Sequence, residues 1–370
     1  MTHKQRILAA INHEPADQVP TYAFKCESGF MKAYDESHDD ISEDSWVQFR
    51  QDQTILVALG VDGTTEPGLG DMPDPESTFK DIVRPDGSFV GASGRIHKVA
   101  SDGRFFYVDG YWTSKEVRAQ FPRRIPQPQM IYDEFGKFYK KNVLEKDKIF
   151  VWPILSGFHE CNWLNMGYVA FARETRKPTG LLDDLVDELY RTNLDIAKQL
   201  LDIDSEMVIA FTDDIAYKDH LLCSPKVFKR FYAPKYKQLF QYIHKRGGKT
   251  MFHTDGDISE LVPDYIDIGL DLLQGLEPVA GVDIITLNEK YGDKISWNGN
   301  IDVSRLLWQG TVDEVRAQCK KIIKAVAPSN NLVFGPSTDI MAWHPIANIV
   351  TLYDTARSFD LKTRQFKDKK

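Results

Sequence analysis

Short apolar runs and amphipathic segments alternate along most of this 370-residue chain. Most of the runs have apolar residues at consecutive positions, which is typical of strands buried on both faces. Eight such runs occur, at 19–25, 62–67, 148–157, 205–214, 249–255, 270–278, 294–302 and 331–339. Segments with helical periodicity follow nearly all of them, as at 181–203 and 312–327. Eight parallel strands separated by crossover helices predict an α/β protein, a (β/α)8 TIM barrel.

An open doubly wound sheet is the alternative for such an alternation. That fold usually carries a glycine-rich phosphate-binding turn after its first strand, and no such turn follows here. We therefore expect residues 1–370 to form one barrel domain, with a helix at 3–13 before the first strand. The segment 78–112 differs, because strand-like pieces are joined there by Pro-Asp-Gly, Ser-Asp-Gly and Val-Asp-Gly. This pattern predicts an antiparallel β-hairpin insertion.

The composition is that of a globular protein, with 42% hydrophobic and 27% charged residues. A formal net charge of -8 argues against a nucleic-acid partner. No apolar run approaches the roughly 20 residues needed to cross a bilayer, so no membrane partner is expected. The N-terminal segment also lacks the hydrophobic stretch of a signal peptide. The four cysteines lie far apart without CxxC spacing, which favours reduced thiols and a cytoplasmic location.

Polar residues gather where the predicted strands end. In a (β/α)8 barrel, these carboxyl ends and the loops after them form the active site. Helix N-caps also prefer Asp, Ser, Thr and Asn, and that interpretation suits Ser224 and Asp257. The remaining candidates are Lys25, Glu66, His159, Glu160, Asp213, Asp214, Tyr217, His253, Asp255, Glu277, Trp297, Asn298 and Asn300. Together they predict a basin rich in carboxylates, with two histidines and aromatic side chains.

His253 is the strongest single candidate. A histidine beside Phe252, at the end of a buried run, gains nothing as a helix cap. With Asp255 two residues later, it can face one cavity. Glu66, Glu160 or Glu277 can then complete a site for a divalent metal such as Zn²⁺. Equally, carboxylates crowded in a shielded basin raise one another's pKa, which suits general acid catalysis at neutral pH. The residues alone leave both interpretations open.

Four stretches of the chain resemble the uroporphyrinogen decarboxylase superfamily. They are RILAAINHEPADQVP at 6–20, DDIAYKDHLLCSPKVFKRFYAPKYKQLF at 213–240, FHTDGDISELVPDYIDIGLDLLQGLEP at 252–278 and ISWNGNIDV at 295–303. Their order and spacing agree with the superfamily over essentially the whole chain. The resemblance implies a (β/α)8 barrel.

The resemblance also separates two branches of the superfamily. True uroporphyrinogen decarboxylases carry an arginine-rich stretch after the first strand that clamps their acidic substrate, whereas this chain has AFKCESGFMKAY there. An acidic basin would repel such a substrate. The other branch comprises methyltransferases that work with a corrinoid protein, some of which bind zinc through His-x-Cys and a distant Cys. His253 matches the first ligand, but Asp255 and Ser337 or Thr338 replace the cysteines, which leaves a harder set suited to oxygen.

The resemblance thus implies the methyltransferase component of a corrinoid-dependent demethylase. It would transfer a methyl group from a small methyl donor, best an aryl methyl ether as in an O-demethylase, to cob(I)alamin. The cobalamin would be carried on a separate corrinoid protein, because this chain has no DxHxxG segment. A decarboxylase of a small aromatic or pyrrolic acid, and a barrel that only binds a corrinoid or ligand, are the rivals. A homodimer is an open alternative.

All of the candidate residues except Glu66 have an expected role in this scheme. The expected catalytic residues are His253, Asp255, Asp213, Asp214 and His159. Substrate binding is expected of Tyr217, Trp297, Asn298, Asn300 and Lys25. The expected Zn²⁺ ligands are His253, Asp255, Glu160 and Glu277.

Overall fold

Eight parallel strands form a barrel in the computed structural model, which describes residues 1–35, 54–69, 82–91, 93–100, 105–121 and 129–367. Neighbours in the chain are neighbours in the sheet. The last strand returns to the first, because Thr21 pairs with Phe334 and the N–H of Phe334 donates to the carbonyl of Pro20 over 2.8 Å. The strands are β1 Tyr22–Ala23, β2 Gly63–Leu69, β6 Phe150–Ser156, β7 Val208–Thr212, β10 Lys249–Thr254, β11 Leu272–Gly275, β12 Ser296–Ile301 and β13 Leu332–Pro336. This confirms the (β/α)8 barrel and the predicted strands.

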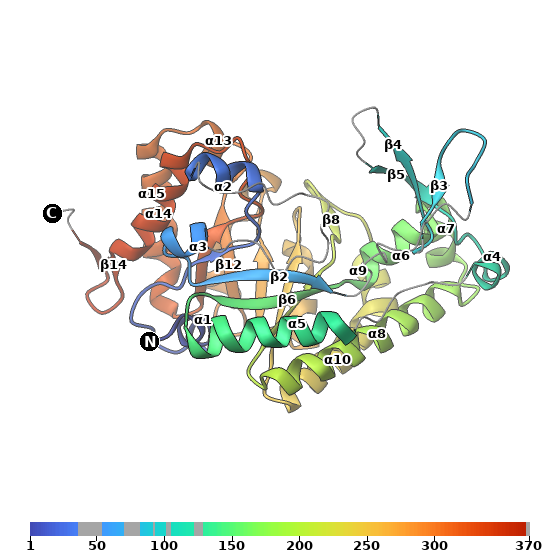
Figure 1. Cartoon of the computed structure of the whole chain (residues 1–370), viewed down its shortest axis with the longest axis horizontal. Helices are drawn as coiled ribbons and strands as arrows, with labels where there is room; N and C mark the ends of the chain where they lie inside the picture. Colours follow the sequence, from blue (N-terminus) through green and yellow to red (C-terminus); the bar gives the residue numbers. More distant parts are fainter. Residues whose placement is uncertain (36–53, 70–81, 92, 101–104, 122–128, 368–370) are drawn as a thin grey trace.

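Helices cover the outside of the barrel, and α5, α8 and α10 lie side by side along one flank (Figure 1). The main ones are α5 Gln129–Tyr139, α6 Phe158–Met166, α7 Tyr168–Arg176, α8 Leu181–Ile203, α10 Ala233–Lys245, α11 Val262–Ile268, α12 Ile284–Tyr291, α14 Val312–Val326 and α15 Ile346–Ser358. Buried Leu182, Leu185 and Leu189 follow the helical spacing of α8 and pack toward the barrel. A capping box between Thr311 and Glu314 opens α14.

Shorter elements fill the connections. They are α2 Ser28–Tyr34, α3 Thr54–Ala58, α4 Lys115–Gln120, α9 Pro225–Val227 and α13 Leu306–Gln309, the π-helical turns η1 Lys140–Glu145 and η2 Phe228–Tyr232, and the 3₁₀ turns η3 Ser259–Leu261, η4 Pro278–Ala280 and η5 Ala327–Ser329. Two small hairpins pair β8 Ala216–Tyr217 with β9 His220–Leu221, and β14 Phe359–Asp360 with β15 Gln365–Phe366. Within the described ranges, no helix is both long and apolar enough to cross a membrane.

The predicted insertion is a three-stranded antiparallel sheet that projects beside α6 and α7 (Figure 1). Its strands are β3 Phe89–Val90, β4 Arg95–Val99 and β5 Phe105–Gly110. The predicted Pro-Asp-Gly turn is present, with Gly87 at φ 80°, whereas Ser-Asp-Gly lies outside the described residues. The Val-Asp-Gly prediction was wrong, because Gly110 ends β5 instead of turning the chain. Gly110 is needed for close packing, since a Cβ there would lie 1.9 Å from the backbone nitrogen of Gly167.

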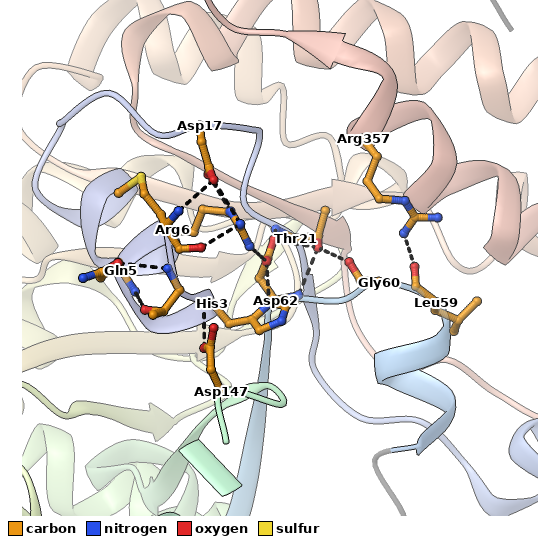
Figure 2. Close-up of polar contacts among 12 residues, drawn as sticks. His3, Gln5, Arg6, Asp17, Thr21, Leu59, Gly60, Asp62, Asp147 and Arg357 are labelled. Carbon is orange, nitrogen blue, oxygen red and sulfur yellow. Dashed lines mark hydrogen bonds and ion pairs between the residues drawn. The ribbon is translucent and has the colours of Figure 1, made fainter. Parts of the chain in front are cut away.

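A network centred on Asp62 fastens the N-terminal helix α1 His3–Ile11 to the amino-terminal end of the barrel (Figure 2). The fully buried Asp62 carboxylate accepts hydrogen bonds from Arg6 Nη1 at 2.6 Å and from the backbone N–H of Thr21 at 2.9 Å. His3 Nδ1 lies 2.8 Å from the same carboxylate. Arg6 also donates to Asp17, which holds the pKa of Asp17 well below its ordinary value. Polar groups at this end of a barrel serve stability.

Candidate active site

Alternation along β10 sends adjacent side chains to opposite sides of the barrel wall. Phe252 packs outside, with its ring centroid 5.3 Å from that of Tyr236 on α10. The sulfur of Met251 lies 3.8 Å from the amide nitrogen of Asn298 on β12. Because β10 and β12 are not neighbours in the sheet, that contact is made inside the barrel. His253, two residues after Met251, therefore also faces inward, at the carboxyl end of β10.

Two neighbours fix the imidazole of His253. Its ring stacks on Phe24, which follows β1, with centroids 4.2 Å apart and planes 19° apart. Its Nδ1 contacts Oε1 of Gln274 on β11. The amide nitrogen of Gln274 in turn donates to the carbonyl of Ser337 at 2.9 Å. The ring is therefore clamped by residues from two other strand ends, and Ser337 at a third holds Gln274 in place.

The same contacts determine which ring nitrogen of His253 is available. Because Nε2 of Gln274 is engaged as a donor, Oε1 is the atom that faces the ring, and an amide oxygen only accepts hydrogen bonds. Nδ1 of His253 must then carry the proton that it donates to Gln274. Nε2 is left to face Asp255, whose Oδ1 lies 3.7 Å away. This tautomer presents a nitrogen lone pair to the acidic residues.

Asp213 and Asp214 follow β7 directly, and the alternation separates their roles. The fully buried Asp213 points outward and accepts from Tyr236 Oη at 2.7 Å. It also accepts from the backbone N–H groups of His159 at 3.1 Å and Glu160 at 2.6 Å, and so caps the amino end of α6. Asp214 points to the mouth, where its carboxylate accepts the backbone N–H of Asp255 at 3.0 Å. The carboxylate of Asp213 thus lies in this cap, and its catalytic role stays a prediction.

Asp214, His253 and Asp255 form the centre of the candidate site. Each offers a ligand atom, and these atoms all lie within 4.8 Å of one another. Oδ1 of Asp255 is buried and has no hydrogen-bond partner among the described residues. A buried carboxylate oxygen without a donor requires a cation or a proton. The arrangement thus suits either a divalent metal or shared protons.

Burial and mutual repulsion shift the pKa values of the acidic groups upward. Burial raises the pKa of Asp255 to about 6. The charge of His253 opposes this shift, and the charge of Asp214 adds to it. Burial and then Asp214 raise the pKa of Glu160 to about 7. For His253, burial disfavours the charged ring, but Asp255 and Asp214 outweigh it and raise the pKa. These are the directions expected where acidic groups outnumber their counter-ions.

Two further carboxylates border this centre. Glu277 follows β11 and accepts the backbone N–H of Gly256 at 2.8 Å, and its charge also raises the pKa of Asp255. Asp339 follows β13, and one of its oxygens is buried without a hydrogen bond among the described residues. Burial raises the pKa of Asp339, although Lys25 and His253 oppose the shift. The mouth is therefore acidic on several sides.

Two predicted site residues lie away from this centre. The buried ring of His159 packs among Phe171 of α7 and Tyr232 of η2, and burial lowers its pKa to about 3. The indole of Trp297 is fully buried outside the barrel wall and donates to Asn288 of α12 at 3.1 Å. The ring of His159 thus packs among helices, and the indole of Trp297 packs between β12 and α12. The catalytic role of His159 and the substrate-binding role of Trp297 stay predictions.

Of the other predicted residues, Asn298 and Asn300 lie on β12, and Tyr217 and Lys25 lie in segments that follow β7 and β1. Asn298 and Asn300 are buried, and the side-chain oxygen of each lacks a hydrogen bond among the described residues. Tyr217 is 63% exposed on the β8–β9 hairpin. Lys25 is exposed after β1. The side chain of Glu66 lies outside the part that the structure describes.

Sequence reasoning gave no role to Gln274, Phe24, Asp339 or Arg95. The first three stand at strand ends, and inward alternation relative to His253 is the signal that would have found Gln274. Arg95 lies in the insertion, and its charge opposes the rise in the pKa of Glu160. No local pattern indicates this effect of charge, because it depends on how the insertion packs.

Comparison with known proteins shows the family and agrees with the fold. Residues 154–359, more than half of the chain, match the family model described as uroporphyrinogen decarboxylase (URO-D). A methyltransferase from Methanosarcina mazei has a similar structure, with a TM-score of 0.68 and 18% identity over 96% of this chain and 98% of that one. A xylose isomerase domain protein from Planctomyces limnophilus is far less similar, with a TM-score of 0.41 and 10% identity over 91% and 94% of the two chains. No curated protein sequence matches the chain.

The fold and the acidic site at its mouth place the protein among (β/α)8 barrels with polar residues at the carboxyl ends of the strands. The chain belongs to the uroporphyrinogen decarboxylase (URO-D) family. Likeness to the Methanosarcina mazei protein, at its low identity, shows the shared barrel fold.

Proposed function

We propose that this protein is the methyltransferase component of a corrinoid-dependent demethylase. The methyl group of a small donor, best an aryl methyl ether, is transferred to cob(I)alamin carried by a separate corrinoid protein. The observation that carries the proposal is the set Asp214, His253 and Asp255, whose oxygen and nitrogen ligands converge at the mouth of the barrel. Hard ligands of this kind suit the activation of an oxygen, and an ether oxygen is where the leaving group forms.

The residues fit a divalent metal such as Zn²⁺. The tautomer fixed by Gln274 turns Nε2 of His253 toward the carboxylates, and Oδ1 of Asp255 is buried without a donor among the described residues. The backbone of Asp255 is itself held by the carboxylate of Asp214. A metal held by these residues, with Glu277 at the edge of the site, supplies Lewis acidity toward an oxygen of the substrate.

Glu160 is proposed as the proton donor. With its pKa raised to about 7, its carboxyl holds a proton in part of the neutral range. In the reaction, the bond between the methyl carbon and the ether oxygen breaks, and the oxygen keeps the electron pair. The oxygen takes the proton from Glu160, while the electron pair of cob(I)alamin forms the new bond to the methyl carbon. Protonation of the leaving oxygen makes this transfer easier at neutral pH.

Substrate contacts are proposed for the polar groups inside the barrel. Asn298 and Asn300 have buried side-chain oxygens that lack hydrogen bonds among the described residues, and these can accept from a hydroxyl group on the substrate. Tyr217 and Lys25, both exposed, are proposed to border the entrance.

The proposal is tested by mixing the purified protein with cob(I)alamin, free or loaded on a corrinoid protein, and a panel of methoxyarenes. Formation of methylcob(III)alamin, followed by its absorbance, is the expected result for at least one donor. Release of CO2 from an aromatic or pyrrolic acid, with no methylcob(III)alamin from any donor, would overturn the proposal in favour of the decarboxylase.

A further inference from the structure

Left-handed backbone conformations gather around Asp255 at the mouth of the barrel. Gly256, which follows Asp255, has φ 80°, and Leu276, which follows β11, has φ 53°. Lys218, in the turn between β8 and β9, has φ 52°, and its carbonyl accepts the backbone N–H of Asp257 at 2.6 Å. Glycine adopts such conformations without steric cost, whereas a leucine is strained there. Strain of this kind persists where the surrounding structure enforces it, and it gathers at functional sites.

The strained turn at Leu276 is fixed to the strands on both sides of β11. The side chain of Leu276 is fully buried, which holds the residue in its conformation. Gly275, just before it, has φ 107°, and a Cβ there would lie 2.1 Å from the carbonyl oxygen of Thr254 on β10. The carbonyl of Leu276 accepts a hydrogen bond from Nδ2 of Asn300 on β12 at 3.1 Å. The turn is therefore held by β10 on one side and by β12 on the other.

The turn brings the carboxylate of Glu277 to the backbone that follows Asp255. Oε2 of Glu277 accepts the N–H of Gly256 at 2.8 Å. The N–H of Asp255 itself donates to Oδ1 of Asp214 at 3.0 Å. The two N–H groups on either side of the Asp255 Cα are therefore each held by a carboxylate from another strand end. Oδ1 of Asp255, which is buried and has no hydrogen-bond partner among the described residues, is the atom that this clamp positions.

Glu277 belongs to this clamp and not to the group of metal-ligating atoms. Among the described residues, the atoms close enough to share a metal come from Asp214, His253 and Asp255 and lie within 4.8 Å of one another. Gly256 completes the clamp, because a Cβ there would lie 2.8 Å from the backbone of β8. The N–H of Gly256 thus lies between the β8–β9 hairpin and Glu277, and Glu277 contacts the site through this backbone group.

We propose that Leu276 and Glu277 are positioning residues for the metal site. The left-handed turn at Leu276 directs the carboxylate of Glu277 to the N–H of Gly256, and this contact holds the ligand Asp255 in place. The inference rests on the proposed function for the metal itself, but the clamp is a property of the metal-free protein. A hydrogen bond from a backbone N–H to a carboxylate is charge-assisted and therefore strong. Residues that orient a metal ligand in this way typically change the metal affinity by about 10- to 100-fold.

Two variants of Glu277 separate positioning from direct ligation. Glu277→Gln keeps an oxygen that accepts the N–H of Gly256 but is a poorer metal ligand, whereas Glu277→Ala removes the acceptor. NMR measures the exchange of the Gly256 amide hydrogen in the metal-free protein, and calorimetry then measures the affinity for Zn²⁺. Glu260→Ala is the control, because Glu260 is an exposed residue of η3.

We expect the Gly256 amide to exchange slowly in the wild-type protein, Glu277→Gln and Glu260→Ala, and faster in Glu277→Ala. Glu277→Ala should also lose about 10- to 100-fold in affinity for Zn²⁺, and Glu277→Gln should lose less. Equal losses of affinity in the two Glu277 variants, or unchanged exchange in Glu277→Ala, would overturn the clamp. If the wild-type protein binds no Zn²⁺ while the amide exchanges as expected, the clamp stands and the metal of the proposed function is overturned.

Two variants of Leu276 test the strained turn. Leu276→Gly and Leu276→Ala both remove the buried side chain, so that the difference between them reports the backbone conformation. Glycine usually destabilises an ordered segment relative to alanine, but at a left-handed position this order is reversed. We therefore expect Leu276→Gly to have the higher melting temperature and the smaller loss of Zn²⁺ affinity. The opposite order of melting temperatures would overturn the role of the turn. If neither variant folds, the Glu277 variants decide the proposal.

Discussion

The two ends of the barrel both bury acidic side chains, but they differ in how far the negative charge is compensated. At the amino-terminal end, Asp62 is surrounded by Arg6, His3 and the hydroxyl and N–H groups of Thr21. At the carboxyl end, Asp255 and its neighbours repel one another, and a carboxylate oxygen is left without a donor among the described residues. One end thus pairs its acid with a guanidinium and further hydrogen-bonding groups, whereas the other end has more acids than cations.

This difference separates stability from function. A buried carboxylate that is fully paired holds elements together, as Asp62 does for α1 and the start of β2. A buried carboxylate that is left without a partner destabilises the fold, and such an arrangement persists where a ligand, a metal or a proton is to be bound. Removing an acidic charge at the mouth should therefore stabilise the protein. Removing the acidic charge at the opposite end should destabilise it.

Substituting Asp62 should have the largest effect on stability. In Asp62→Ala, Arg6 and His3 lose a buried partner, and we expect the free energy of unfolding to fall by about 3–5 kcal/mol. Urea denaturation, with Asp313→Ala as the control, measures the effect, since Asp313 is an exposed surface residue. The turnover number at a temperature where the variant is folded should be unchanged. A loss of less than 1 kcal/mol, with turnover reduced, would reverse the roles assigned to the two ends.

Substituting Glu160 should have a smaller effect of opposite sign. The pKa of Glu160 is raised in the folded protein, so its contribution to stability is fully present below its unfolded value of 4.5 and is lost as pH rises through about 7. Glu160→Gln should remove this loss and raise the free energy of unfolding at pH 8 by about 1–3 kcal/mol, while slowing methyl transfer. Denaturation at pH 5 and pH 8 measures the change in the free energy of unfolding. The idea fails if the stability of the wild-type protein and the variant changes equally between the two pH values.

The local pattern of apolar and polar residues predicts much of the fold. It predicts the candidate site only in part. Buried runs and helical periodicity were sufficient to place the eight strands, because each element is marked along its own sequence. The period of two also determines which of two neighbouring strand residues faces the barrel interior. Asp213 and Asp214 cannot face the same side, and neither can Trp297 and Asn298, so one of each pair had to lie against the helices. The place of Arg95 depends on contact between Gly110 and Gly167, residues far apart in sequence, which no local pattern encodes.

The most direct test of the account is the binding of Zn²⁺ at the mouth. Titration of the metal-stripped protein with Zn²⁺ by calorimetry, at pH 7.5, should give one tight site per chain. His253→Ala should lose it, whereas His220→Ala, whose side chain is 83% exposed on the β8–β9 hairpin, should retain it. If the wild-type protein and His253→Ala bind Zn²⁺ equally, or if neither binds it, the cluster of Asp214, His253 and Asp255 is not a metal site and the central claim is contradicted.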